Sequence, residues 1–71
     1  MRRYLAVFEE TGTGYSAYSP RLDGCVSTGR TREEVQRNKR EAIEFHLDGL
    51  RHEGLEVPAP HTYSAYVEVP A

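Results

Sequence analysis

The side chains best suited to nucleophilic or metal chemistry in this chain are one cysteine, Cys25, and three histidines, His46, His52 and His61. His46 and His52 are six residues apart, so they do not share one face of a helix. No Cys and His pair has the spacing of a zinc site. Cys25 follows a glycine turn at the start of an expected strand, where a small buried thiol is a commoner role than a nucleophile. These residues predict no catalytic centre, no metal site and no bound cofactor.

Carboxylates could hold the metal ions of a nuclease if they were clustered. The two aspartates are Asp23, in an expected turn, and Asp48, on the charged side of an expected helix. Glu9 and Glu68 lie near expected strand ends but form no matched set with them. A degenerate metal-dependent nuclease is therefore the least favoured alternative.

Length and composition describe one small domain spanning residues 1–71, with 38% hydrophobic and 28% charged residues. A chain of this size buries only about 60% of its unfolded surface, so its own core is marginal. The usual supports are disulfides, a metal or self-association. One cysteine excludes an internal disulfide, so we expect a homodimer or a higher homo-oligomer.

The formal net charge is −2, which disfavours direct binding to nucleic acid. The sequence has no apolar run of the length that a signal peptide or a membrane span needs. A lone thiol without an export signal indicates a cytoplasmic protein with no membrane contact.

The elements that must position these residues begin with three expected strands. Residues 4–8 and 14–19 are rich in apolar and tyrosine side chains, and the segment Glu-Glu-Thr-Gly-Thr at 9–13 separates them by a hairpin length. We therefore expect them to pair antiparallel. A turn at Asp23-Gly24 then leads to a brief third strand at residues 25–28.

A helix should follow, because Thr31-Arg32-Glu33-Glu34 is a capping box. The pattern predicts a helix that ends near Glu53, with Gly54 as its C-terminal cap. At 100° per residue one arc of this helix is apolar, and it contains Val35, Ala42, Ile43, His46, Leu47 and Leu50. Lys39 also falls inside that arc, where its stem could cover apolar surface while the ammonium group reaches water.

Residues 61–69 alternate again and predict a last strand. A right-handed crossover from the helix would set this strand parallel to the first one. The expected fold is thus α+β with the order β-β-β-α-β. Its four-stranded mixed sheet has the order 3-2-1-4 and carries one long helix on one face, a partial ribonuclease H-like architecture.

Alternation in these strands also predicts which side chains share a face. Tyr4, Ala6, Phe8, Tyr15 and Ala17 should face the helix. Leu5, Val7, Tyr18 and Tyr66 should lie on the opposite face, which one helix cannot cover. We expect these four residues to form an oligomer or partner surface.

Residues 19–35 resemble the HicB-like antitoxin family, which is also grouped among uncharacterised small proteins. The family pattern is Pro-Asp-Leu-Pro-Gly-Cys, two or three residues, Gly-Asp-Thr, one residue, then Glu-Glu-Ala. The residues that match it here are Pro20, Leu22, Gly24, Cys25, Ser27, Gly29, Thr31, Glu33 and Glu34. Departures occur at Arg21, Asp23 and Arg30.

The resemblance implies an antitoxin that neutralises a HicA-like mRNA interferase toxin by protein–protein contact, without enzymatic activity of its own. Full-length HicB proteins usually carry a second, DNA-binding domain after this one, and we expect that domain to be lacking here. An acidic domain with an exposed sheet face also suits a basic partner. The alternative is an orphan domain of the same fold that assembles with itself and has no toxin.

Overall fold

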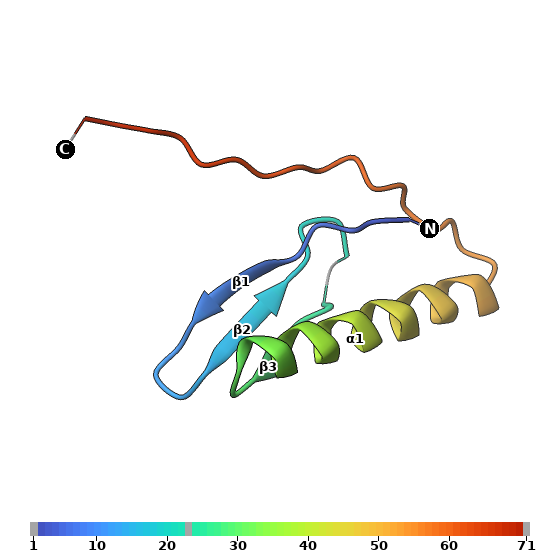
Figure 1. The fold of residues 1–71 in the computed structure, drawn as a ribbon. Helices are drawn as coiled ribbons and strands as arrows, with labels where there is room; N and C mark the ends of the chain where they lie inside the picture. Colours follow the sequence, from blue (N-terminus) through green and yellow to red (C-terminus); the bar gives the residue numbers. More distant parts are fainter. Residues whose placement is uncertain (1, 23, 71) are drawn as a thin grey trace.

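The computed structural model describes residues 2–22 and 24–70. Its strands are β1 (Val7–Glu10), β2 (Tyr15–Tyr18) and β3 (Ser27–Gly29), and its helix is α1 (Arg32–His52). The strands form an antiparallel sheet of order β1-β2-β3, and α1 lies across one face of it (Figure 1). The predicted α+β class and the β-β-β-α part of the order are therefore confirmed.

The β1–β2 hairpin forms as the loop length predicts. Residues 11–14 connect the strands, and the Thr11 N–H donates a 2.8 Å hydrogen bond to the carbonyl oxygen of Gly14. The register sets Phe8 opposite Ala17. Opposed residues share a face of the sheet. Ala17 is buried on the side where α1 contacts β2, so the helix covers the predicted face.

Strand β3 starts two residues later than the predicted segment 25–28, because its pairing with β2 begins at Ser27. The start of α1 packs very closely on the end of this strand. A Cβ atom on Gly29 would lie only 2.6 Å from the backbone nitrogen of Val35. Only glycine leaves room there, so this one residue sets how near the helix can approach the sheet.

The predicted capping box starts α1. Thr31 is the N-cap residue, and its hydroxyl accepts a 3.0 Å hydrogen bond from the Glu34 N–H. The Glu34 carboxylate reaches back to the N–H of Arg30, one residue before the cap, at 3.2 Å. Two backbone donors near the start of the helix thereby gain acceptors.

The helix ends within one residue of the predicted position. Its last residue is His52, and Gly54 follows in the left-handed conformation with φ of 71°. The Leu55 N–H donates to the carbonyl oxygen of Leu50 at 2.9 Å, and Gly54 donates to Arg51 at 3.1 Å. These are the two hydrogen bonds of a Schellman motif, which satisfies the last carbonyl groups and turns the chain back.

The two sides of α1 differ in burial as the helical pattern predicts. All members of the apolar arc are buried or half-buried, namely Val35, Ala42, Ile43, His46, Leu47 and Leu50. The charged residues opposite them are exposed, namely Glu33, Arg37, Arg40, Glu41, Glu44, Asp48 and Arg51. The apolar arc therefore faces the sheet and the charged side faces water.

Lys39 departs from the expectation that its ammonium group reaches water. The residue is only 1% exposed, and its Nζ donates a hydrogen bond to the carbonyl oxygen of Cys25. Asn38 beside it donates a 2.9 Å hydrogen bond to the carbonyl oxygen of Thr28. Because both side chains bond to the backbone in or just before β3, they fix the rotation of α1 above the sheet.

The core is small and lies between α1 and the segment that joins β2 to β3. Leu22, Cys25 and Leu47 form its buried cluster. The side chains packed around this cluster are half-buried and include Tyr4, Ala42, Ile43, Leu50 and Val57. The thiol of Cys25 is free and buried.

Among residues 2–22 and 24–70 the structure shows neither the expected fourth strand nor the sheet order 3-2-1-4. Residues 61–69 are extended but form no ladder, so β1 is an edge strand rather than a central one. We call residues 55–70 the C-terminal tail; its outer part runs beside β1 but stands off it (Figure 1). Alternating apolar and polar residues indicate a segment that can join a sheet, but the segment becomes a strand only when its backbone forms hydrogen bonds with a neighbouring strand.

Candidate functional site

The sheet face turned away from α1 carries the first part of the predicted surface. Val7 and Tyr18 are cross-strand partners in the β1–β2 ladder, so their side chains lie together on this face. Tyr18 is 45% exposed and Val7 is half-buried. Leu5 precedes Val7 by two residues and is also half-buried. None of the described elements covers this face, because α1 lies on the other one.

Val26 directly precedes β3 and is 64% exposed. Its neighbour Ser27 pairs with Ala17 and is buried on the helix side. Val26 lines a pocket together with Cys25 and with Phe45 and His46 of α1, so it is not counted with the patch of Leu5, Val7 and Tyr18.

Tyr66 approaches β1 from the C-terminal tail. Leu5, Val7 and Tyr66 all line a groove of about 600 Å³ between β1, the tail and the start of α1, which contributes Val35 and Gln36. Three of the four predicted surface residues are thus brought around one groove, and the fourth, Tyr18, is the cross-strand neighbour of Val7. Tyr66 itself is fully exposed.

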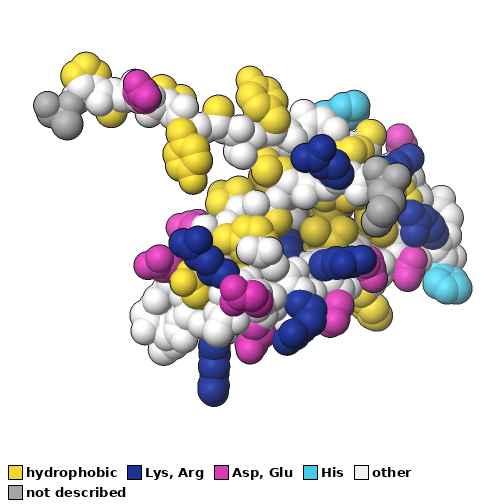
Figure 2. All heavy atoms as spheres, viewed as in Figure 1, with side chains coloured by type: hydrophobic (Ala, Val, Ile, Leu, Met, Phe, Trp, Pro, Cys, Tyr) yellow, Lys and Arg dark blue, Asp and Glu magenta, His cyan; other side chains and the backbone are white. Residues whose placement is uncertain are grey.

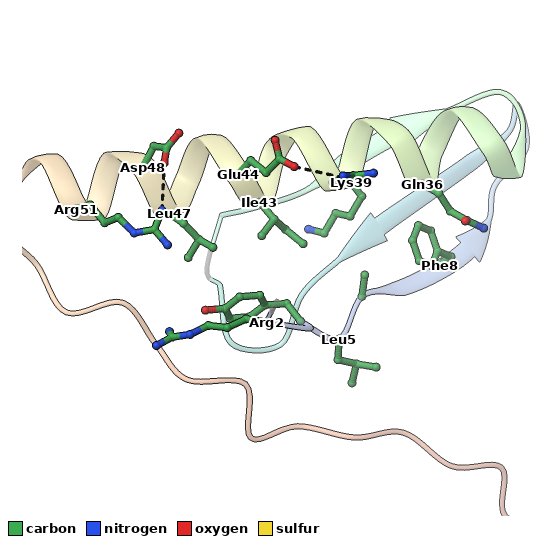
Figure 3. A pocket seen from close by; sticks show the side chains of 13 residues that line it. Arg2, Leu5, Phe8, Gln36, Lys39, Ile43, Glu44, Leu47, Asp48 and Arg51 are labelled. Carbon is green, nitrogen blue, oxygen red and sulfur yellow. Dashed lines mark hydrogen bonds and ion pairs between the residues drawn. The ribbon is translucent and has the colours of Figure 1, made fainter.

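A second opening lies on the helix side of β1. The helix contacts β2 and β3, and the space between α1 and the chain leading into β1 remains open. This cleft has a volume of about 960 Å³ and an apolar interior of Tyr4, Ala6, Phe8, Ile43 and Leu47. Figure 3 shows Phe8, Ile43 and Leu47 pointing into it, with Lys39 at its upper wall.

Charged side chains form the rim of this cleft along α1. Arg40 and Glu44 make an ion pair at 3.3 Å, and Arg51 and Asp48 make another at 3.2 Å (Figure 3). All four side chains are at least 60% exposed, so these pairs add little to stability. The two ion pairs give the cleft a polar rim around an apolar interior, and this arrangement is typical of protein–protein contact sites.

Of the residues considered for catalysis, Cys25 and His46 line one pocket beside α1. Within residues 2–22 and 24–70 no group of three or more His, Cys, Asp or Glu side chains could hold a metal ion. Asp23, which was considered as a nuclease carboxylate, lies outside the described residues. In the described part of the chain, no helix is long and apolar enough to cross a membrane.

The motif residues have structural roles that can be read one by one. Leu22 and Cys25 are buried, and Gly24 has φ of 77° in the turn between them, a conformation that glycine adopts without strain. Gly29 admits the helix and Thr31 starts it. A chain that carries these residues in this order should therefore share this fold.

Comparison with known proteins agrees with that reading. A model of the HicB-like antitoxins of bacterial toxin–antitoxin systems matches residues 4–71. The chain belongs to this family. A UPF0150 protein of Helicobacter pylori is 48% identical over 50 residues, which cover 70% of this chain and 69% of that protein.

A longer protein is also similar. An uncharacterized 14.9 kDa protein of Haemophilus phage HP1, from its rep-hol intergenic region, is 33% identical over 67 residues. The match covers 94% of this chain and 50% of the phage protein, so this chain spans half the length of that relative.

Solved structures extend the family likeness to three dimensions. A chain of a HicA3 and HicB3 toxin–antitoxin complex matches with a TM-score of 0.71 and 32% identity, covering 84% of this chain and 70% of that one. The structure of the antitoxin HicB3 matches with a TM-score of 0.70 and 33% identity, over 80% of this chain and 42% of the other. The HicB-like fold of this chain is thus supported by both sequence and structure.

Proposed function

We propose that this protein is an antitoxin that neutralises a HicA-like mRNA interferase toxin by protein–protein contact. The observation that carries the proposal is the likeness to a chain of the HicA3 and HicB3 complex, at a TM-score of 0.71 and 32% identity. The net charge of −2 suits a partner that is basic because it binds RNA. The protein acts by binding and not by catalysis, and it works in the cytoplasm.

The contact surface is the outer face of the sheet with its tyrosines. Leu5, Val7 and Tyr18 supply an apolar patch on the body, and Tyr66 supplies an aromatic ring from the tail. Tyrosines are enriched among the residues that dominate binding energy, since they combine a large apolar ring with a polar hydroxyl group.

The second candidate function is self-assembly without a toxin, with a homodimer or a higher homo-oligomer as the active form. The tail favours it, since Tyr63 and Val67 are more than 80% exposed there. Exposed apolar side chains in this number are unusual for a monomer. The two functions are compatible if separate parts of the surface serve them.

The test is co-expression with the product of a small basic reading frame adjacent to the gene. The toxin alone should arrest growth, and the proposed antitoxin should restore it. Tyr18→Asp should abolish the rescue, whereas Phe45→Asp should retain it, because Phe45 is an equally accessible aromatic residue on α1, with 82% exposure. Growth arrest that the parent protein does not relieve would refute the proposal.

A further inference from the structure

We propose that residues 61–69 form the fourth strand of the sheet in a second copy of this chain, beside β1 of that copy. Two chains would exchange tails in this way and make a symmetric dimer. The inference deepens the self-assembly part of the proposed function and does not depend on the toxin. It rests on three observations among the described residues: beyond residue 60 the tail is largely exposed and makes no hydrogen bonds, β1 has a free edge, and the chain exposes more surface than a compact monomer of its size.

The tail has the composition of a strand but no contacts that would hold it as one. Among the described residues, none from 61 to 70 takes part in a hydrogen bond. Tyr63 is 87% exposed, Val67 81% and Val69 75%, and hydrophobic side chains stand out along the tail in Figure 2. These residues and Ala65 alternate with polar or aromatic ones, so a sheet would receive them all on one face.

Strand β1 offers a complementary edge. It pairs with β2 on one side, and on its other side no described strand accepts its backbone groups. An edge of this kind is a template for a further strand. The openings beside β1 also fit such a strand, since the groove near Leu5 and Val7 and the cleft under α1 adjoin along this edge and share Phe8 and Gln36 in their linings.

Alternation along the incoming strand lets one of its faces fill the cleft under α1. Ala65 and Val67 share a face in a strand, with Tyr66 on the opposite one, so both can point to the helix side. There they would meet the apolar interior of the cleft, which includes Phe8 and Ile43. The strand would thereby close the opening between α1 and β1 and bury its own apolar side chains.

The exposed area has the size that a dimer of this kind would remove. The chain exposes 6069 Å². A compact monomer of 8.1 kDa exposes about 4,500 Å². The difference is about 1,600 Å² per chain, or about 3,200 Å² for two chains, which falls in the range of obligate homodimers. The radius of gyration is 13.9 Å, whereas about 11 Å is expected for a compact chain of 71 residues.

A second copy is the favoured partner because the tail leaves the body in an open conformation. The Tyr4 hydroxyl donates a 2.7 Å hydrogen bond to the carbonyl oxygen of Pro58. Pro58 and Pro60 restrict the backbone, so the segment that follows is stiff and extended. Beyond this link the tail runs in the same direction as β1 without joining it (Figure 1). Because the link keeps the tail away from β1 of its own chain, the free edge of β1 and the backbone of residues 61–69 can both pair with a second copy. Dimers that exchange an element commonly form in this way.

Disulfide trapping tests the exchange directly. Val7→Cys and Tyr66→Cys are combined in one full-length chain, since both residues line the groove beside β1. Mild oxidation should convert most of the protein to a covalent dimer on a non-reducing gel. The parent, which carries only buried Cys25, and each single variant measure the background. A disulfide within one chain, or no disulfide above background, would overturn the exchange.

Sedimentation of the parent protein supplies an independent measurement that needs no cysteine variant. It should show a dimer at micromolar concentration, and Val67→Asp should raise the dissociation constant at least about tenfold by placing a charge in the cleft. Glu68→Gln, on the other face of the strand, should change it less than about twofold. A monomeric parent that still relieves toxin arrest would refute the exchange and leave the proposed toxin binding intact.

Discussion

The Tyr4 hydroxyl donates a 2.7 Å hydrogen bond to the carbonyl oxygen of Pro58, and so joins the start of the chain to the segment beyond the helix. The two residues are 54 positions apart in sequence. The Schellman turn at Gly54 reverses the chain, and this bond fixes where the reversed chain meets the body. These two contacts set where the tail leaves the body.

Tyr4→Phe removes this bond and keeps the ring. A part-buried hydrogen bond contributes about 1 kcal/mol, so the free energy of unfolding should fall by about that amount in urea denaturation. Tyr63→Phe is the matched control, because Tyr63 is 87% exposed and its loss of a hydroxyl should change stability by less than about 0.5 kcal/mol. Equal effects of the two substitutions would show that the Tyr4 bond is not stabilising.

Lys39 tests whether a buried ammonium group or its aliphatic stem holds α1 on the sheet. Lys39→Ala should lower the free energy of unfolding by about 2–4 kcal/mol, because it leaves a cavity beside Cys25. Lys39→Met keeps most of the volume and ends the burial of a charge, which offsets the lost hydrogen bond, so the change should stay within about 1 kcal/mol. Urea denaturation of both variants separates the contributions. If Met destabilises as much as Ala, the bond to Cys25 matters more than packing.

The same substitution at two glycines should have opposite signs. Gly29→Ala would place a Cβ 2.6 Å from the backbone of Val35, so it should destabilise by about 1–3 kcal/mol. Gly49→Ala meets no atom within 4 Å and lies inside α1, where alanine favours the helix, so it should stabilise by about 0.5–1 kcal/mol. Thermal unfolding followed by circular dichroism gives both values. A loss of stability at both sites would contradict the assignment of Gly29 as the contact point.

Thr31→Ala tests the start of the helix. It removes the acceptor of the Glu34 N–H and should cost about 1 kcal/mol of stability. Thr31→Ser restores an acceptor and should recover most of that loss. Thr13→Ala, in the exposed hairpin loop, serves as the control. Chemical denaturation that ranks Ala and Ser equally at position 31 would contradict the role of the cap.

Local signals predicted the helix and the hairpin well because the interactions that define them are local. The capping box, the glycine after His52 and the four-residue loop each specify hydrogen bonds between residues close in sequence. The pairing of residues 61–69 could not be predicted in the same way, since a ladder depends on an edge that lies far away in the chain or in another chain. The alternation of apolar and polar residues indicated that this segment can form a strand, but it did not indicate which strand it would pair with.

The candidate surface was predictable to a similar extent. Strand parity placed Val7 and Tyr18 on one face, and the register brings them together. It did not reveal the environment of Lys39, because the acceptor for its ammonium group is a backbone carbonyl that no side-chain pattern encodes.

Direct binding to the purified HicA-like toxin is the measurement that bears most closely on the antitoxin assignment. Calorimetry should show a saturable complex with the parent protein. Tyr18→Asp should weaken it at least about tenfold and Phe45→Asp less than about twofold. Both variants should retain the circular dichroism of the parent, since both residues are exposed. The absence of binding by the folded parent, or a loss at Phe45 with none at Tyr18, would contradict an antitoxin that works through the outer face of its sheet.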